Sequence, residues 1–331
     1  MTNFNGVWSL TAQYQAKGNS NWSPPLGGDV GLFGREGEIT FVNIATDGNA
    51  ADFGDHSGSN NAPRMSGSGT RAIFRCELVS GSTSNVIEFC AIQTKGNTTD
   101  FGDVSSTLNG ATGSSSISNG TRALFAGGSV SSVGDRNTIE YITIANTGNS
   151  TDFGDLSVAR DDGDGLASTT RGVFGMGRSS GGDFSSNTID YVTIGSTGNA
   201  SDFGDLSVVR NRYAGACSNT RGLCMGGYNT SGSYSGTSSR LNVIDYITIA
   251  STGNASDFGD LTAYGDGGAT SNKTKAIFSY ANEHGFTGDA ADTNTIDKVT
   301  IASTGNASDF GDAATNTGST VRATSDSHGG L

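Results

Sequence analysis

Apolar residues in this chain come in short runs separated by glycine and polar turns, a pattern that predicts strands rather than helices. The clearest run is residues 242–250, Asn-Val-Ile-Asp-Tyr-Ile-Thr-Ile-Ala, which is rich in β-branched and aromatic side chains. Residues 221–227 predict a strand that ends in paired glycines, and residues 210–218 predict a strand of small side chains before it. Residues 255–261 predict a fourth strand, so the four together form one structural unit.

This unit repeats along the chain. The phrase Gly-Asn-x-x-Asp-Phe-Gly-Asp occurs six times, with 48 to 55 residues between the starts of successive copies. A period of about 50 residues is typical of the blades of kelch-type propellers and is longer than the period of leucine-rich repeats. The sequence therefore predicts an all-β fold, a six-bladed kelch-type β-propeller that spans residues 28–331. The copies begin at Gly48, Gly96, Gly148, Gly198, Gly253 and Gly305.

The core of such a fold lies between neighbouring blades. In residues 189–194, Ile-Asp-Tyr-Val-Thr-Ile, apolar side chains point to both faces of the strand, as expected for a blade packed between two others. We expect aromatic residues of the repeated phrase and of the second strands to fill this core, with Cys224 in the matching place of the fifth blade. These aromatic residues are Phe53, Phe101, Phe153, Phe203, Phe258 and Phe310, and Phe33, Phe74, Phe125, Phe174 and Phe278.

The two ends of the chain predict how the ring closes. The first repeat has a second, a third and a fourth strand, at residues 30–34, 38–44 and 52–55, but no first strand. Residues 321–331 resemble the first strand of the other repeats in abbreviated form. A C-terminal strand that completes the N-terminal blade would close the ring and leave few exposed edges. Residues 1–27 fall outside the repeat and are expected to form a docking or capping segment.

The charge and the cysteine content of the chain limit its expected partners and its expected cellular compartment. The formal net charge is -13 and the pI is near 4.5, which disfavours nucleic acid and anionic membrane surfaces as partners. No apolar stretch is long enough to cross a bilayer and no signal peptide is recognisable, so we expect a soluble protein made in the cytoplasm. The four cysteines are expected to be reduced and buried, although Cys217 and Cys224 flank a predicted turn and could pair.

The sequence offers no recognisable catalytic or metal site. Its three histidines, His56, His284 and His328, fall at unrelated blade positions, and no nucleophile motif accompanies them. The aspartates of each repeated phrase, such as Asp52 and Asp55, could hold Ca²⁺, but they lack the spacing and the bidentate glutamate of an EF-hand loop. We therefore expect their side chains to accept hydrogen bonds from turn N–H groups, and we expect no enzyme activity, no metal and no cofactor.

A basic residue opens the second strand in five blades. In a propeller, the turn between strands one and two shares a face with the turn between strands three and four. These cations are therefore expected near the Gly-Asn-x-x-Asp segments, where Asp–Arg pairs would stiffen that face. A cationic ring that grips an anionic ligand is the alternative, which the overall acidity disfavours. The five residues are Arg71, Arg122, Arg171, Arg221 and Lys275.

The connections between strands two and three vary in length and content, and variation gathered on one face of a repeat protein favours a recognition surface there. Exposed aromatic side chains beside Asp, Asn and Arg suit stacking on sugar rings and hydrogen bonding to hydroxyl groups. Loops that are merely solvated are the alternative. The candidate ligand-binding residues are Tyr228, Tyr234, Arg240, Glu283, His284, Phe286, Asp183 and Phe184.

The repeated unit resembles kelch repeats in its Gly-Gly pair after strand two and in its strand-three aromatic, Tyr141, Tyr191 or Tyr246. It departs from them by placing Phe-Gly-Asp-Leu where Trp-x-x-Leu is expected. The phrase Thr-Gly-Asn-Ala-Ser-Asp-Phe-Gly-Asp-Leu is similar to repeats in virion and tail-appendage proteins of bacteriophages, and this resemblance covers about residues 28–331. The run Gly-Val-Trp-x-Leu near the N-terminus, with the Gln-Tyr-Gln that follows it, also resembles leader segments of phage structural proteins.

The phage resemblance implies a non-enzymatic virion protein, a propeller module of the tail, neck or fibre apparatus that is made in the host cytoplasm and serves assembly or host attachment. Its partners would be other virion proteins, docked through Trp8, Tyr14 and Trp22, and a host surface glycan would be a further ligand. Folding of Trp8 and Trp22 back onto the propeller is an equal alternative for that segment. The alternative function is a free-standing lectin-like carbohydrate-binding module, which would need no obligatory partner.

Overall fold

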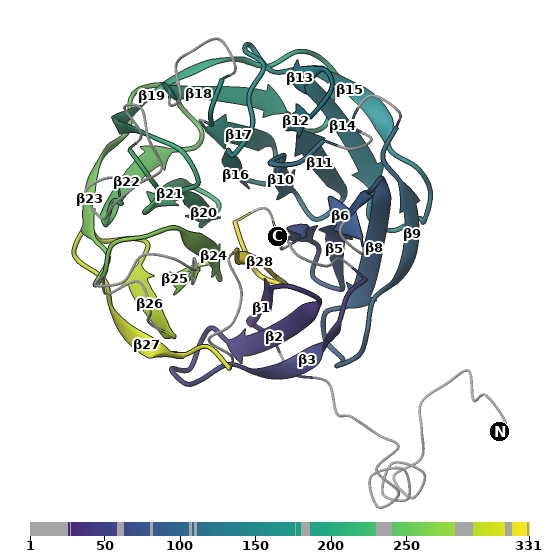
Figure 1. Cartoon of the computed structure of the whole chain (residues 1–331). Coiled ribbons are helices and arrows are strands. Elements are labelled where there is room, and N and C mark those ends of the chain that lie inside the picture. The colour runs from purple at the N-terminus through teal and green to yellow at the C-terminus, as the bar shows by residue number, and fades with distance from the viewer. Residues whose placement is uncertain are drawn as a thin grey trace, which may run out of the picture.

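Six antiparallel sheets of four strands each stand around a central axis, as Figure 1 shows. The protein is therefore an all-β six-bladed β-propeller, and the predicted fold class and blade count are confirmed. No helix in the described part of the chain is long and apolar enough to cross a membrane. The computed structural model describes residues 26, 28–57, 63–79, 82–105, 108, 111–175, 177–179, 186–229, 240–281, 294–314, 320–329 and 331.

Blade one is built from both ends of the chain. Its sheet has the order β28 (Arg322–Ser325), β1 (Val30–Gly34), β2 (Glu38–Asn43) and β3 (Ala51–Asp55), with every neighbouring pair antiparallel. In Figure 1 the yellow C-terminal strand β28 lies beside the purple β1. The predicted closure of the ring by a C-terminal strand is confirmed.

The other five blades each use four strands that are consecutive apart from two short hairpins. The first strand of each blade lies nearest the axis and the fourth lies at the rim (Figure 1). Blades two and three consist of β4 (Arg64–Gly67), β5 (Arg71–Arg75), β8 (Val86–Ala91) and β9 (Thr99–Asp103), and of β10 (Ser115–Ser118), β11 (Arg122–Ala126), β14 (Thr138–Thr143) and β15 (Thr151–Asp155). Blades four, five and six consist of β16 (Asp164–Ala167), β17 (Arg171–Gly175), β18 (Ser186–Thr193) and β19 (Ser201–Arg210), of β20 (Ala214–Cys217), β21 (Arg221–Met225), β22 (Val243–Thr248) and β23 (Ser256–Asp260), and of β24 (Gly267–Ser271), β25 (Lys275–Tyr280), β26 (Thr295–Thr300) and β27 (Ser308–Asp312).

Two short hairpins extend the connections between strands two and three. In blade two the hairpin pairs β6 (Leu78–Val79) with β7 (Ser82–Thr83), and in blade three it pairs β12 (Ser129–Val130) with β13 (Gly134–Asp135). These connections share one face of the propeller with the segments that lead from the fourth strand of one blade to the first strand of the next. We call this the loop face, and we call the opposite one, which carries the turns within strands one–two and three–four, the turn face.

The apolar core lies between neighbouring blades, as the sequence predicts. One buried cluster joins Phe153 of blade three to Phe174 and Val192 of blade four. Within a blade, the strand-three aromatic meets the phenylalanine of the repeated phrase edge-on, as Tyr191 meets Phe203 with 6.0 Å between ring centroids and 77° between ring planes. Because burial of a phenylalanine contributes roughly 1.5 to 3 kcal/mol, this repeated pair is a principal source of stability.

All four cysteines are buried and free, so the predicted reduced state is confirmed and Cys217 is not paired with Cys224. Cys224 is 3% exposed and takes the place that phenylalanine has in the other blades. Burial raises the pKa of the Cys224 thiol to about 12 and that of Cys217 to about 11. Both side chains therefore act as small apolar groups at neutral pH.

The repeated phrases form a continuous ring of hydrogen bonds at the outer edge, which we call the rim belt. At each joint the first glycine of one phrase donates to the phenylalanine carbonyl of the preceding blade, as Gly253 does to Phe203 at 2.7 Å. The next residue accepts a bond from the preceding blade, since Asp205 N lies 3.1 Å from Asn254 Oδ1. The same bonds occur at all six joints, with the acceptors Asn49, Asn97, Asn149, Asn199, Asn254 and Asn306.

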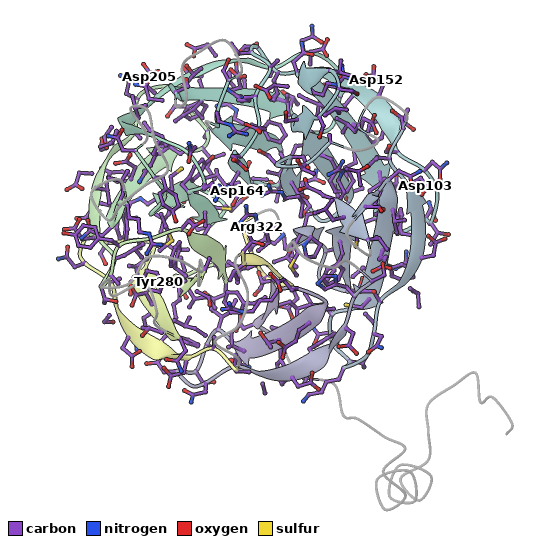
Figure 2. The ribbon with its side chains drawn as sticks, viewed as in Figure 1. Asp103, Asp152, Asp164, Asp205, Tyr280 and Arg322 are labelled. Atoms are coloured by element: carbon purple, nitrogen blue, oxygen red, sulfur yellow. The ribbon has the colours of Figure 1, made fainter. Side chains whose placement is uncertain are left out.

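The rim belt corrects one expectation about the aspartates. The acceptor for the N–H group is the asparagine side chain of the next phrase, and among the described residues no hydrogen bond reaches an aspartate side chain of the repeated phrase. The prediction that these carboxylates accept turn N–H groups is therefore wrong. They lie at the rim, where water solvates them, as the side chains of Asp152 and Asp205 show in Figure 2.

The basic residues that open the second strands stack on aromatic rings instead of pairing with aspartates. The Arg171 guanidinium lies 4.4 Å from the Tyr191 ring centroid, and its Nη1 donates to the Ile249 carbonyl of the next blade at 2.9 Å. Among these five residues only Lys275 has a carboxylate partner in the described structure, Asp47, at 3.0 Å. The predicted ring of Asp–Arg pairs is wrong because a ring face and a strand-end carbonyl already satisfy each arginine. The equivalent stacking pairs are Arg71 with Phe89, Arg122 with Tyr141, and Arg221 with Tyr246.

Candidate functional site

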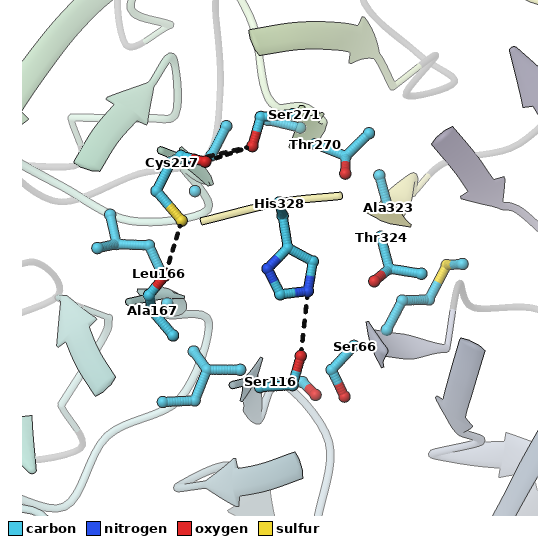
Figure 3. Close-up of a pocket in the computed structure, with 17 residues that line it drawn as sticks. Ser66, Ser116, Leu166, Ala167, Cys217, Thr270, Ser271, Ala323, Thr324 and His328 are labelled. Atoms are coloured by element: carbon cyan, nitrogen blue, oxygen red, sulfur yellow. Dashed lines mark hydrogen bonds between the residues drawn. The ribbon is translucent and has the colours of Figure 1, made fainter. Parts of the chain in front are cut away.

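The central channel is closed at the turn face. The first strands of the blades line it with mostly small side chains and leave a cavity of about 50 Å³, shown in Figure 3. The C-terminal tail crosses this end, where His328 Nε2 lies 3.2 Å from Ser118 Oγ. Burial lowers the pKa of His328 to about 4, although a backbone contact at Gly67 acts in the opposite direction. The imidazole is therefore a neutral plug at pH 7.

At the loop face the channel ends in a polar pocket of about 170 Å³, which we call the mouth pocket and take as the candidate functional site. In Figure 2, Arg322 and Asp164 lie near the axis, whereas Asp103 lies at the rim. Most of the lining comes from the first residues of the first strands and from the connections that lead into them, whereas Glu77 and Arg178 come from connections between strands two and three. The lining comprises Arg64, Glu77, Thr112, Gly113, Asp161, Asp162, Arg178, Arg212, Thr320 and Arg322.

Buried carboxylates on the third strands anchor the connections that carry these residues. Asp190 on β18 accepts hydrogen bonds from the N–H and hydroxyl groups of Ser157 and lies 2.7 Å from Arg160 Nη2. Asp245 on β22 holds the next connection, with its Oδ2 at 2.8 Å from Arg210 Nη2. Because buried ion pairs with several hydrogen bonds resist rearrangement, the segments next to them enter the pocket in a defined conformation.

On the blade-two side of the pocket, the Glu77 carboxylate binds two arginines. Its Oε1 lies 3.3 Å from Arg64 Nε and 2.8 Å from Arg75 Nη1, and it accepts further hydrogen bonds from Ser114 and from the Gly113 N–H. Burial acts to raise the pKa of Glu77, but the two guanidinium groups and these hydrogen bonds outweigh it and hold the pKa at about 2. Glu77 is therefore ionised at every physiological pH.

Two further ion pairs lie across the pocket. Arg178 reaches Asp161 with two bonds, of 3.1 Å from Nε and 2.7 Å from Nη2. Arg212 Nε lies 3.4 Å from Asp162 Oδ2. Burial raises the pKa of Asp161, and the hydrogen bond from Arg178, which acts to lower it, offsets only part of this effect. These pairs fix the direction in which the two carboxylates face the pocket.

Arg322 lacks such a partner. Its Nη1 donates to the Val321 carbonyl at 2.8 Å, and it forms no ion pair with any described residue. Burial lowers the pKa of Arg322 to about 10, and the positive charge of Arg64 acts in the same direction. Strand pairing puts Arg322 and Arg64 at the same first-strand position of adjacent blades, and Asp164 at that position in blade four. This first-strand position at the mouth therefore carries arginine in blades one and two and aspartate in blade four.

The backbone of the mouth pocket is strained at two positions. Gly113, Asp162 and Arg212 occupy equivalent places in three consecutive connections and have φ values of 75°, 55° and 52°. Each of the last two donates its N–H to the carbonyl of the one before, at 2.8 and 2.9 Å. A non-glycine residue in this left-handed region costs roughly 1 to 3 kcal/mol, and such strain concentrates at functional sites. Two of the three described non-glycine residues with positive φ thus line this pocket.

Two residues of the predicted ligand-binding set are described, and both are buried. Tyr228 is 3% exposed and Arg240 is 6% exposed, with the guanidinium carbon 5.8 Å from the ring centroid. The Tyr228 hydroxyl lies 3.3 Å from Asp266 Oδ1. The expectation that these two side chains are exposed for stacking on a sugar is therefore wrong, because they pack on each other. The predicted residues outside the described part of the chain are Tyr234, Glu283, His284, Phe286, Asp183, Phe184, Trp8, Tyr14 and Trp22.

No group of three or more His, Cys, Asp and Glu side chains that could hold a metal ion occurs among the described residues. Ca²⁺ binding by the repeated phrases stays an untested alternative. The mouth pocket itself offers guanidinium donors, carboxylate and hydroxyl acceptors, and no described histidine or cysteine. Its chemistry suits the binding of a polar ligand.

Sequence reasoning directed attention to the long connections between strands two and three and missed the mouth pocket. The available signal was charge placement in a chain with only 15% charged residues. Arg160, Asp161 and Asp162 stand together directly before a first strand, and Arg210 and Arg212 do so one blade later. Since the first strands surround the axis, charged residues at their starts must converge on one end of the channel.

The fold and this pocket define the protein as a closed β-propeller with a charged mouth at one end of its channel. No model of a known protein family matches the chain, and no curated protein matches it either.

Proposed function

We propose that the chain is a non-enzymatic structural protein of a bacteriophage virion, a kelch-like propeller module of the tail, neck or fibre apparatus that serves assembly or host attachment. It needs no cofactor for this role. Its residence in the virion, after synthesis in the host cytoplasm, is part of the proposal. The similarity of the repeated Gly-Asn-Ala-Ser-Asp-Phe-Gly-Asp-Leu phrase to phage virion repeats supports the virion assignment.

The observation that carries the proposal is the contrast between the two parts of the fold. The rim belt repeats the same bonds at all six joints, which makes the ring a rigid scaffold. Three of the exposed large apolar side chains among the described residues lie in connections of the loop face, and the fourth, Val209, lies near the end of β19 that leads into such a connection. The four are Val133, Val158, Val209 and Tyr264, at 60%, 49%, 39% and 56% exposure. Exposed apolar groups gathered on one face favour a protein-binding or host-binding surface there.

The N-terminal segment is proposed to dock the propeller on another virion protein through Trp8, Tyr14 and Trp22. Tryptophan and tyrosine are the residues that most often carry the binding energy of an interface. Under this arrangement the loop face is presented outward, and a host surface glycan is a proposed ligand of that face.

The test is to purify intact particles of a phage that encodes this chain and to examine them by mass spectrometry and cryo-electron microscopy. We expect the chain in the particle and a six-lobed disc of density on the tail, neck or fibre. A phage with Trp8→Ala and Trp22→Ala should lose that disc, whereas one with Tyr264→Ser should keep it and be altered only in adsorption to the host. Particles that lack the chain would refute the proposal.

A free-standing lectin-like module is the second candidate, favoured by the mouth pocket. Its mixture of guanidinium, carboxylate and hydroxyl groups matches the polar groups of a sugar. This candidate predicts that the purified chain, with no partner, binds specific structures on a glycan array. Glycan binding by a chain that is absent from particles would establish it over the first.

A further inference from the structure

The lining of the mouth pocket carries a small excess of positive charge in an acidic protein. Four arginines line it, whereas the whole chain carries a formal charge of -13. An excess of positive charge in a cleft with low-dielectric walls attracts an anion even when the net charge of the protein opposes it. Three carboxylates share the lining, so the pocket presents donors and acceptors together.

One guanidinium group at the pocket has an unsatisfied donor. Arg64 is 5% exposed, and its Nη1 is buried without a hydrogen-bond partner. The Arg64 Nε donates to Glu77. Glu77 also accepts hydrogen bonds from Arg75 and Ser114, and it accepts none from Arg64 Nη1. A buried donor without an acceptor is unfavourable, so a shift of the Arg64 side chain that brings Nη1 to an anionic ligand in the pocket would remove that penalty.

Arg322 adds a second guanidinium beside the first. It lines the same pocket from the adjacent blade and has no ion-pair partner among the described residues. Two neighbouring guanidinium groups at equivalent strand positions form a site for a planar carboxylate, since each presents paired N–H donors.

The hydrogen-bond acceptors that line the mouth pocket limit which class of anion can bind there. Asp161 and Asp162 line the pocket as carboxylates held by arginines, and the hydroxyls of Thr112 and Thr320 lie among them. Carboxylates repel a doubly charged phosphate or sulfate but accept hydrogen bonds from hydroxyl groups. A ligand that satisfies the whole pocket therefore carries one negative charge and several hydroxyls.

We propose that the mouth pocket binds one residue of an acidic sugar of the uronic acid type. Its carboxylate lies between Arg64 and Arg322, and its hydroxyls donate to Asp161 and Asp162. The volume of about 170 Å³ suits a single sugar ring. This inference goes beyond the proposed function, because a virion protein and a free-standing module could both carry the site.

The test is calorimetric titration of the full-length protein with D-galacturonate and D-glucuronate, with D-galactose and inorganic sulfate as comparison ligands. We expect binding of at least one uronate, no measurable binding of galactose and weaker binding of sulfate. Arg322→Gln should weaken uronate binding at least about tenfold. The matched control is Lys273→Gln, which makes the same charge change at an exposed position of the turn face and should alter affinity less than about twofold.

A second variant separates binding from folding. Arg212 has a φ of 52°, which glycine adopts without strain, so Arg212→Gly should keep the melting temperature. It removes the group that orients Asp162 and should weaken uronate binding several-fold.

Absence of uronate binding, or an equal loss in Arg322→Gln and Lys273→Gln, would overturn the proposal. Sulfate binding as tight as that of the uronates would overturn the sugar assignment. None of these outcomes bears on whether the chain is found in virus particles, which is measured separately.

Discussion

At the scale of single residues, the glycine in each Asp-Phe-Gly-Asp phrase is required by the neighbouring blade. Gly204 has a φ of 144°, and a Cβ there would lie 2.6 Å from the Gly253 carbonyl carbon. Since that atom belongs to the backbone of the rim belt, the clash cannot be relieved by a side-chain rotation. This contact explains why the phrase keeps glycine between phenylalanine and aspartate in all six copies.

Gly204→Ala should therefore lower the free energy of unfolding by more than about 2 kcal/mol, measured by urea or thermal unfolding. Gly195→Ala is the matched control, because nothing lies within 4 Å of its added Cβ, and its effect should stay within about 0.5 kcal/mol. Similar effects of the two substitutions would contradict the packing argument.

His328 makes stability depend on pH in a defined direction. Its pKa is about 4 in the folded protein, against 6.5 for an unperturbed histidine. At a pH between these two pKa values, the unfolded chain binds a proton at this histidine that the folded chain excludes. The contribution of the buried neutral imidazole to the free energy of unfolding is therefore complete above pH 6.5 and is lost as the pH falls toward 4.

The melting temperature should decrease when the pH is lowered from 7 to 5. The melting temperature of the His328→Asn variant should decrease less over the same interval. The pKa of His56 is also lowered by burial, and this group is present in both proteins, so the difference between them reports on His328. An identical pH dependence of the two would show that the C-terminal plug does not exclude the proton.

At the scale of elements, the contact between one blade and the next rests on short polar bonds as well as on the apolar core. The asparagine in each phrase ties the turn before a fourth strand to the fourth strand of the preceding blade. Asn254 does so between β19 and the turn that precedes β23, through its 3.1 Å bond from Asp205 N.

Asn254→Ala should lower the free energy of unfolding by about 1 kcal/mol, the usual net contribution of such a hydrogen bond. Thr252→Ala, two residues earlier in the same exposed turn, serves as the control and should be nearly neutral. Denaturant unfolding of both variants beside the parent protein measures the difference. A loss equal to that of the control would mean that water replaces the bond at no cost.

The elements were largely predictable from the sequence, and the side-chain partners were not. The β-branched run at residues 243–248 and the missing first strand of the first repeat are patterns of the chain itself, so β22 and the closing strand β28 could both be predicted. The partner of Arg171 could not, because a guanidinium is satisfied equally by a carboxylate or by a ring and a carbonyl. Only the position of the next blade decides between these partners.

The mouth pocket was missed for a related reason. Arg64 and Arg322 stand far apart in the chain, near opposite ends, and neither belongs to the repeated phrase. Their proximity follows from ring closure together with strand register, since both open first strands of adjacent blades. A register error of one residue would have moved either side chain to the other face of its strand.

At the scale of the whole molecule, closure by the C-terminal strand decides whether the propeller is stable. Without β28, the strand β1 would expose its inner edge and the neighbouring first strands would lose a partner. An exposed edge strand promotes aggregation.

A chain that ends at residue 319 should unfold at a markedly lower temperature and aggregate on size-exclusion chromatography. A synthetic peptide of residues 320–331 should restore part of the lost melting temperature, because the strand needs no covalent link to pair. A chain without residues 1–25 is the control, since it keeps every described strand. Equal stability of the two truncated chains would refute the role of closure.

A further consequence of this closure is mechanical. Tension on the N-terminal segment enters the propeller at β1, which is hydrogen-bonded on one side to β28 and on the other to β2. Because the bonds of both ladders run across the strand, a pull along β1 must shear them all together instead of opening them one after another. The C-terminal strand has only a single ladder among the described residues. A load applied along β1 would therefore be shared by both ladders.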